Sequence, residues 1–198
     1  MDPMQTIPLD EPHVDLTFPH TYQVQDRFEL PGSGESEIPT IYIPPPRNRA
    51  EHPGVWLRVR ASSGRAWTGV FAYGLGGPFG FSRIMSSPDP DSVIVISKGA
   101  AYLVRADDPS SVKQLPILPV TDARAIAEHG LVIFANFSRL FAYGRDGLRW
   151  ESSHLCTDSL EILSVEGRTI TCSGWDGGGP TEMMELAVDL QTGKVHLH

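Results

Sequence analysis

The sequence has few cysteines: only Cys156 and Cys172 among 198 residues. A disulfide framework is therefore excluded, and this usage favours a reducing compartment. Two buried free thiols are the preferred interpretation, although the two residues are also placed where neighbouring strands would let them face each other. Their pairing stays open at this point.

Long apolar runs are missing as well, since no stretch approaches the roughly 20 residues that a membrane-spanning helix needs. The first residues, MDPMQTIPLDEP, have neither a basic start nor an apolar run and predict no secretion signal. Basic residues are outnumbered, with 16 Lys and Arg against 24 Asp and Glu, for a net charge of −8. This charge repels nucleic-acid phosphates and anionic membrane surfaces. We expect a cytoplasmic protein that binds neither nucleic acid nor membranes.

Compact catalytic motifs are also absent. The sequence contains no GxSxG elbow, no HExxH pair, no paired CxxC and no aspartate-rich calcium loop. Acidic residues are spread so evenly that no pair stands out as a catalytic dyad. We therefore assign no catalytic residue, no metal ligand and no cofactor, and an enzyme is the less favoured class.

Turn-forming residues and apolar strands are what the sequence does contain. It has 17 Pro and 19 Gly, which indicate many turns and few long helices, and 40% apolar residues, which suffice for a core. The stretch Gly130–Trp150 alternates like a strand, breaks at Phe137-Ser138, resumes, and turns at Asp146-Gly147. Asp-Gly is a strong hairpin signal, so this stretch predicts three antiparallel strands with Gly147 at a positive φ.

A similar pattern occurs earlier in the chain, at an apparent offset of 38 residues. Val93–Ile96 matches Leu131–Phe134, which predicts that Val95 and Ile133 occupy equivalent inward positions. The units run from about Phe81 to Leu115, from about Ala123 to Trp150, and from about Leu160 onward. Residues 39–73 supply part of a fourth unit. Four short strands per roughly 40 residues are typical of propeller blades.

The predicted organisation is an N-terminal arm, 1–37, partly extended and packing on the body, followed by a single all-β domain, 38–198. Two arm segments, Val14–Phe18 and Tyr22–Leu30, alternate enough for strands, and the arm is expected to cover an otherwise open sheet. Thr121–His129 has a composition that allows a helix, but the spacing of the units favours a strand.

The C-terminal part resembles quinoprotein-type propeller repeats. Leu186–Val195, read as LAVDLQTGKV, is similar to their blade hairpin, and Arg145–Trp150 is similar to a shorter version that ends in the blade tryptophan. Only three units are evident, and two of them lack the tryptophan. The resemblance therefore implies a strand pattern and implies neither quinone binding nor dehydrogenase activity.

Two glycine-rich loops are candidate binding sites, because loops on rigid β scaffolds often bind ligands. In the loop 175–180 we expect Trp175 to be an aromatic contact, Asp176 a polar anchor and Gly177 part of the same site. The segment Gly74–Gly80 and the aromatic cluster around it add Phe79 and Trp67 as candidate partner contacts.

The leading hypothesis for function is a non-catalytic module that binds another protein on a propeller-like β scaffold. One alternative is a hydrolase whose carboxylates or histidines are brought together by the fold. Another is a small-ligand binder at the glycine-rich loops. The oligomeric state and the identity of the partner stay open.

Overall fold

A computed structural model describes residues 12–27, 38–45, 51–75, 80–179 and 183–196, and within these the chain is built from four β-sheets. Two 3-10 turns, η2 (Pro109–Ser111) and η3 (Ala127–His129), are the helical elements of this part of the chain. The all-β class predicted from the sequence is confirmed.

The four sheets follow one another along the chain. The first has the order β2-β4-β5-β3, the second β1-β6-β7-β8-β9, the third β10-β11-β12-β13 and the fourth β14-β15-β16. In chain order the strands are β1 (His13–Asp15), β2 (Gln23–Arg27), β3 (Thr40–Ile43), β4 (Gly54–Arg60), β5 (Ala66–Ala72), β6 (Arg83–Ser86), β7 (Ser92–Ser97), β8 (Ala100–Arg105), β9 (Lys113–Gln114), β10 (Asp122–Ile126), β11 (Leu131–Ala135), β12 (Leu140–Gly144), β13 (Gly147–Glu151), β14 (Asp158–Glu166), β15 (Thr169–Trp175) and β16 (Met183–Asp189).

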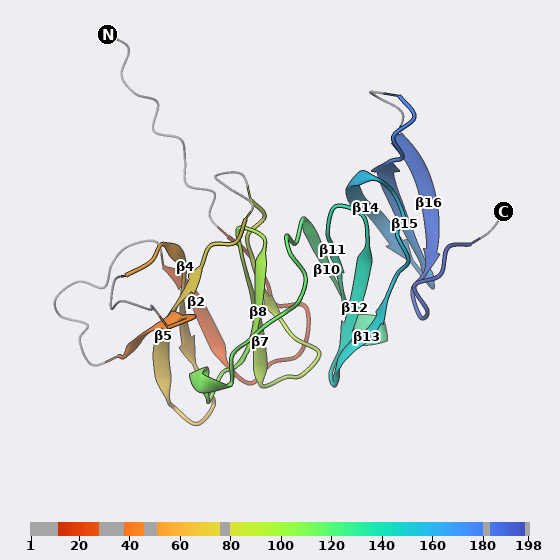
Figure 1. Cartoon of the computed structure of the whole chain (residues 1–198). Coiled ribbons are helices and arrows are strands. Elements are labelled where there is room, and N and C mark those ends of the chain that lie inside the picture. The colour runs from red at the N-terminus through yellow and green to blue at the C-terminus, as the bar shows by residue number, and fades with distance from the viewer. Residues whose placement is uncertain (1–11, 28–37, 46–50, 76–79, 180–182, 197–198) are drawn as a thin grey trace, which may run out of the picture.

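The sheets stand side by side like successive blades, and three apolar clusters fill the spaces between them (Figure 1). Trp67 and Tyr102 lie between the first and second sheets, and Phe134 lies between the second and third. Ile133 and Ile162 lie between the third and fourth sheets. A middle sheet therefore buries both faces, which is the packing of a propeller-like stack of mostly antiparallel sheets with three to five strands each.

The repeat between the second and third sheets is 39 residues, and the predicted offset of 38 is wrong. Val95 pairs with Tyr102 in the second sheet, and Phe134 pairs with Phe141 in the third. Both partners are thus displaced by 39 residues (134 − 95 and 141 − 102). The pairing of β6 with β7 maps onto that of β10 with β11 by the same shift. The residue equivalent to Val95 is therefore Phe134, not Ile133.

The one-residue error reverses the face of every side chain. Val95 packs in the cluster facing the first sheet, whereas Ile133 packs in the cluster facing the fourth sheet. Every residue of β7 and of β11 is buried. A strand buried on both faces is apolar at each position, so its sequence does not show which face is which.

The N-terminal arm completes two of the sheets. Its strand β2 pairs antiparallel with β4, and β1 pairs parallel with β6. Two buried hydrogen bonds anchor the segment between these strands. The hydroxyl of Tyr22 donates to the carbonyl of Ser92 at 2.9 Å, and the backbone N–H of Phe18 donates to Oγ of Ser86 at 2.8 Å. The arm packs on the body as predicted.

Most of the predicted strands and turns are found. Thr121–His129 contains β10 and the turn η3, so the strand was the correct choice. Gly147 has φ +108° as predicted, but the residues that form the turn are Arg145 and Asp146, one position earlier than expected. Beside the fourth sheet, Val195 forms an isolated antiparallel bridge with Val188 of β16.

Tryptophan side chains tie neighbouring sheets together. The indole N–H of Trp67 donates to the carbonyl of Ala106 at 2.8 Å, and that of Trp150 donates to the carbonyl of Leu190 at 2.9 Å. Gly193 lies under the Trp150 ring with φ +69°, so that a Cβ there would stand 2.5 Å from Cε3 of the indole. The hairpin after β16 is thus shaped to receive the tryptophan of the preceding sheet.

Both cysteines are buried free thiols. Burial raises the pKa of Cys172 to about 12, so its thiol stays protonated at neutral pH.

Candidate functional site

Two adjoining pockets lie along the first strands of the third and fourth sheets, with volumes of about 450 Å³ and about 370 Å³. Arg124 of β10 lines both of them. We call the pair the first-strand groove. Its larger pocket is lined by His13, Asp15, Arg83, Arg124, Ala125, Ile126, Ile162, Leu163, Ser164 and Val165. Its smaller pocket is lined by Thr121, Asp122, Arg124, Phe137, Ser159, Leu160 and Glu161.

Arginine side chains cross between the sheets at this groove. Arg83 of β6 donates from Nη1 to the carbonyl of Ala123 on β10 at 2.5 Å. Arg124 of β10 donates from Nη2 to the carbonyl of Ile162 on β14 at 3.2 Å. We call β6, β10 and β14, which begin the antiparallel part of the second, third and fourth sheets, their first strands. A guanidinium group thus links β6 to β10 and another links β10 to β14, and the Arg124 side chain is still 45% exposed.

Asp122 is the buried carboxylate of the groove. Its Oδ1 accepts from the N–H of Ala123 at 2.7 Å, and its Oδ2 lies 3.2 Å from Nη2 of Arg124. This second contact is an ion pair, and Oδ2 accepts no hydrogen bond of good geometry. Burial raises the pKa of Asp122, and the nearby charge of Arg124 opposes that rise.

The rim of the groove carries exposed apolar side chains. Phe137 and Leu163 are each about half exposed. The loop that carries Phe137 is fixed to the fourth sheet, because the N–H of Leu160 donates to the Phe137 carbonyl at 3.0 Å. Next to it, Ser159 has φ +58°, a conformation that non-glycine residues rarely adopt. Apolar contacts, a guanidinium and a carboxylate are thus presented together.

The chemistry of this set suits recognition. A guanidinium presents several donors in a fixed fork and binds carboxylates with two parallel hydrogen bonds. The contacts just described use only Nη2 of Arg124, so Nε and Nη1 have no hydrogen bond or ion pair among the described residues. Among the described residues, no three His, Cys, Asp or Glu side chains gather closely enough to hold a metal ion.

The loop predicted to bind a ligand follows Trp175, the last residue of β15 in the fourth sheet. The indole of Trp175 is half-buried and donates to the carbonyl of Gly179 at 2.5 Å. Oδ1 of Asp176 accepts from the N–H of Gly178 at 2.8 Å, and Gly177 has φ +95°. The polar groups expected to anchor a ligand are therefore engaged in shaping the loop itself.

The other two candidate residues have different fates. Trp67 is fully buried between the first two sheets, which leaves no indole surface for a partner. The expectation that Trp67 contacts a partner is therefore wrong, because the aromatic side chains of its strand, β5, belong to the core. Phe79 lies outside the described residues.

The sequence did not single out Arg83, Asp122 or Arg124. Each stands at or near the start of a short apolar strand, where a charged residue normally faces solvent. A charged residue in the first strand of two successive units was the available signal. This signal does not predict a site on its own, because the groove forms only where neighbouring first strands align.

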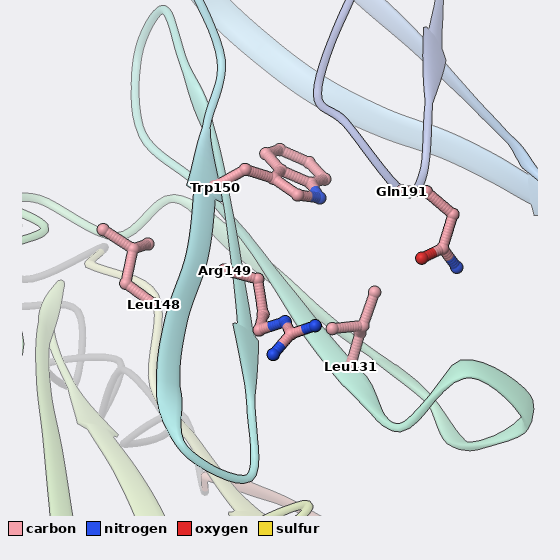
Figure 2. A pocket seen from close by; sticks show the side chains of 5 residues that line it. All are labelled: Leu131, Leu148, Arg149, Trp150 and Gln191. Atoms are coloured by element: carbon pink, nitrogen blue, oxygen red, sulfur yellow. The ribbon is translucent and has the colours of Figure 1, made fainter.

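A third pocket, of about 210 Å³, lies beside β13, at the opposite edge of the third sheet. Figure 2 shows the side chain of Trp150 pointing toward the turn that carries Gln191, with Arg149 and Leu131 below it and Leu148 on the other side of the strand. The amide of Gln191 is 3.3 Å from Nδ1 of His129. These residues belong to the tryptophan contact between the third and fourth sheets.

Within the part of the chain that the structure describes, none of the helical segments has the length and apolar character needed to cross a membrane.

Comparison with known proteins yields one weakly similar structure. No family model matches the chain, and no curated protein matches it. Among solved structures, the crystal structure of the N-terminal domain of Nup159 is similar, with 12% sequence identity and a TM-score of 0.35. The match covers 88% of this chain and 53% of that one, so the chain spans about half of its length. The likeness is weak, and the propeller-like fold rests on the strand pairing described above.

Proposed function

We propose that the chain is a non-catalytic binding module that holds a segment of another protein in the first-strand groove. The observation that carries this proposal is the half-exposed guanidinium of Arg124, which lies between two pockets with exposed apolar side chains at their rim. Phe137 and Leu163 supply that apolar surface. A fixed cation flanked by apolar contacts matches the make-up of protein-binding surfaces, where aromatic residues and arginine are enriched.

The size of the groove favours a polypeptide over a small metabolite. The smaller pocket is reached from Thr121 and Ser159, and the larger one extends to Ile126 and Val165. The six residues from Thr121 to Ile126, five of which form β10, extend over about 17 Å at roughly 3.3 Å per step along the strand. A ligand that fills both pockets is therefore long and narrow, as an extended peptide is.

Selection from a display library of linear dodecapeptides tests this proposal. The full chain is the bait, and the affinity of enriched peptides is measured by titration calorimetry. Arg124→Ala and Leu163→Ser should each weaken binding tenfold or more, which corresponds to about 1.4 kcal/mol. Arg149→Ala is the matched control, since Arg149 is exposed on β13 at the far edge of the same sheet, and it should leave binding unchanged. Peptides that bind all variants equally, or no enrichment at all, would contradict the proposal.

A second candidate function, hydrolysis, is favoured by Asp122. This carboxylate is buried beside the smaller pocket with a raised pKa, as a general acid requires, and Glu161 lines the same pocket. Chromogenic ester, glycoside and phosphate substrates test it: turnover that Asp122→Asn abolishes supports an enzyme. Turnover that survives this substitution excludes Asp122 as the acid.

A further inference from the structure

The 39-residue repeat produces the same kind of groove twice. Between β6 and β10 the space is crossed by Arg83, which donates to the carbonyl of Ala123. Between β10 and β14 it is crossed by Arg124, which donates to the carbonyl of Ile162. Two successive pairs of first strands thus stand side by side, each pair bridged by one guanidinium.

The chain's own N-terminal arm covers the edge of β6 beside the first of these spaces. Strand β1 lies on the open edge of β6 in parallel orientation, with His13 opposite Arg83 and Asp15 opposite Met85. His13 and Asp15 line the same pocket as Arg124, so β1 is on the side of β6 that faces β10. A three-residue extended segment is therefore sufficient to occupy a first-strand edge in this fold.

The corresponding edge of β10 has no strand on it among the described residues. The strands β10 and β14 run in the same direction along the groove. Thr121 lines one pocket with Ser159–Glu161, and Ile126 lines the other with Leu163–Val165. The space between them is an open channel with a strand edge on either side.

Backbone groups for a guest strand are available on β10. The N–H and C=O of Ala123 face the open edge, because the side chains of Asp122 and Arg83 bond to them. Since residues of a strand alternate between its two edges, the N–H and C=O of Ala125 face the same edge. Ala123 is thus capped by side chains, whereas the edge groups of Ala125 have no hydrogen bond among the described residues.

We infer that the partner segment binds by strand addition: an extended stretch of another protein pairs with the β10 edge at Ala125 and sets an acidic side chain on Arg124. This inference rests on the proposed function. Main-chain hydrogen bonds supply affinity in such complexes, and pockets for alternate side chains supply specificity. By the 39-residue shift, the β10 residues equivalent to those that β1 pairs with are Asp122–Arg124, and the backbone groups of Ala123 among them are already bonded to side chains. The guest therefore lies on the β10 edge as β1 lies on the β6 edge but pairs further along, at Ala125, and its carboxylate takes the remaining donors of the Arg124 guanidinium. Its apolar residues contact Leu163 and Phe137.

A synthetic peptide with the sequence of residues Pro12–Phe18 is the first probe, because these residues already fit the equivalent edge. Binding to ¹⁵N-labelled full chain is followed by NMR. We expect shift changes along β10 and β14. Changes confined to β6 would show that the peptide only exchanges with β1 and would overturn the inference. Concentration-dependent dimerisation of the chain alone, abolished by Arg124→Ala, would make a second copy the occupant and would likewise overturn it.

Backbone chemistry separates strand addition from other modes of groove binding. Peptides methylated on the backbone nitrogen of Val14 or of Asp15 lose one donor each, and because successive N–H groups point to opposite edges, at least one should bind tenfold more weakly. A peptide with Asn in place of Asp15 should also bind more weakly to the wild type, but not to Arg124→Ala. If neither methyl group matters while Arg124→Ala and Leu163→Ser still weaken binding, strand addition is wrong and the proposed function stands.

On the protein side, Ala125→Pro removes the N–H that a guest strand would use. The N–H of Ala125 is not part of the ladder with β11, so the sheet should survive, and edge strands tolerate proline. Thermal unfolding confirms that the variant folds. Loss of peptide binding with retained folding is the expected result.

Discussion

Replacing Gly193 by Ala should separate the third and fourth sheets. A Cβ at this position would stand 2.5 Å from Cε3 and 2.9 Å from Cδ2 of Trp150. The indole cannot move away freely, since its N–H is bonded to the carbonyl of Leu190 at 2.9 Å. Either the ring is displaced and this hydrogen bond is lost, or the hairpin after β16 shifts.

The cost has three parts. A non-glycine residue in the left-handed region costs roughly 1 kcal/mol, a lost hydrogen bond about 1 kcal/mol, and partial exposure of the indole about another 1 kcal/mol. The free energy of unfolding should therefore fall by about 3 kcal/mol. Gly167→Ala is the matched control: Gly167 has φ +56° in the hairpin between β14 and β15, and its Cβ would meet nothing within 4 Å. It should cost only about 1 kcal/mol.

Urea unfolding followed by far-UV circular dichroism measures both values. In a Trp150→Ala background the clash no longer exists, so Gly193→Ala should then cost no more than Gly167→Ala. Equal costs for the two glycine substitutions in the wild type, or an undiminished cost for Gly193→Ala without Trp150, would refute the assigned contact.

Three further substitutions or truncations test other parts of the account. Gly147→Val places a β-branched residue at φ +108° and should lower the free energy of unfolding by about 1 kcal/mol or more; an unchanged melting curve would count against this turn. Because the folded-state pKa of Asp122 is raised, the folded state favours the protonated carboxyl, and this contribution to stability is present at acid pH and fades as pH rises past the folded pKa. Asp122→Asn should therefore be most favourable, relative to wild type, at neutral pH and lose its advantage toward pH 3; the opposite trend in melting temperature would contradict the assignment. Deleting residues 1–37 removes β1 and β2 and should cause aggregation or a loss of cooperative unfolding, whereas a soluble, monomeric and equally stable product would show that the arm is dispensable.

The strands of this protein were largely predictable from local patterns. Hairpins with a glycine in or directly after the turn, such as Gly167 and Gly147, have a strong local signature, and both glycines have a positive φ. The register of the repeat was not predictable, because β7 and β11 are buried on both faces and their sequences carry no face preference. Only the pairing partners, such as Val95 with Tyr102, reveal the 39-residue period.

The candidate site was harder to predict than the fold. The aromatic cluster around Trp67 made this residue a candidate partner contact. Large aromatic side chains lie in the core more often than at a binding surface, and the indole of Trp67 joins two sheets. The sequence around Arg124 does not indicate a site, because a single arginine in a short strand is common. Its significance arises from the alignment of β10 with β14, which no local pattern encodes.

Amide hydrogen exchange at Ala125 tests the central claim most directly. The exchange rate of its N–H is measured by NMR in the free full-length chain and again when the chain is saturated with the Pro12–Phe18 peptide. Because a guest strand would accept a hydrogen bond from this group, exchange should slow by tenfold or more, with little change at control amides on β13. An unchanged exchange rate at Ala125, with the peptide shown by calorimetry to be bound, would contradict strand addition at the first-strand groove.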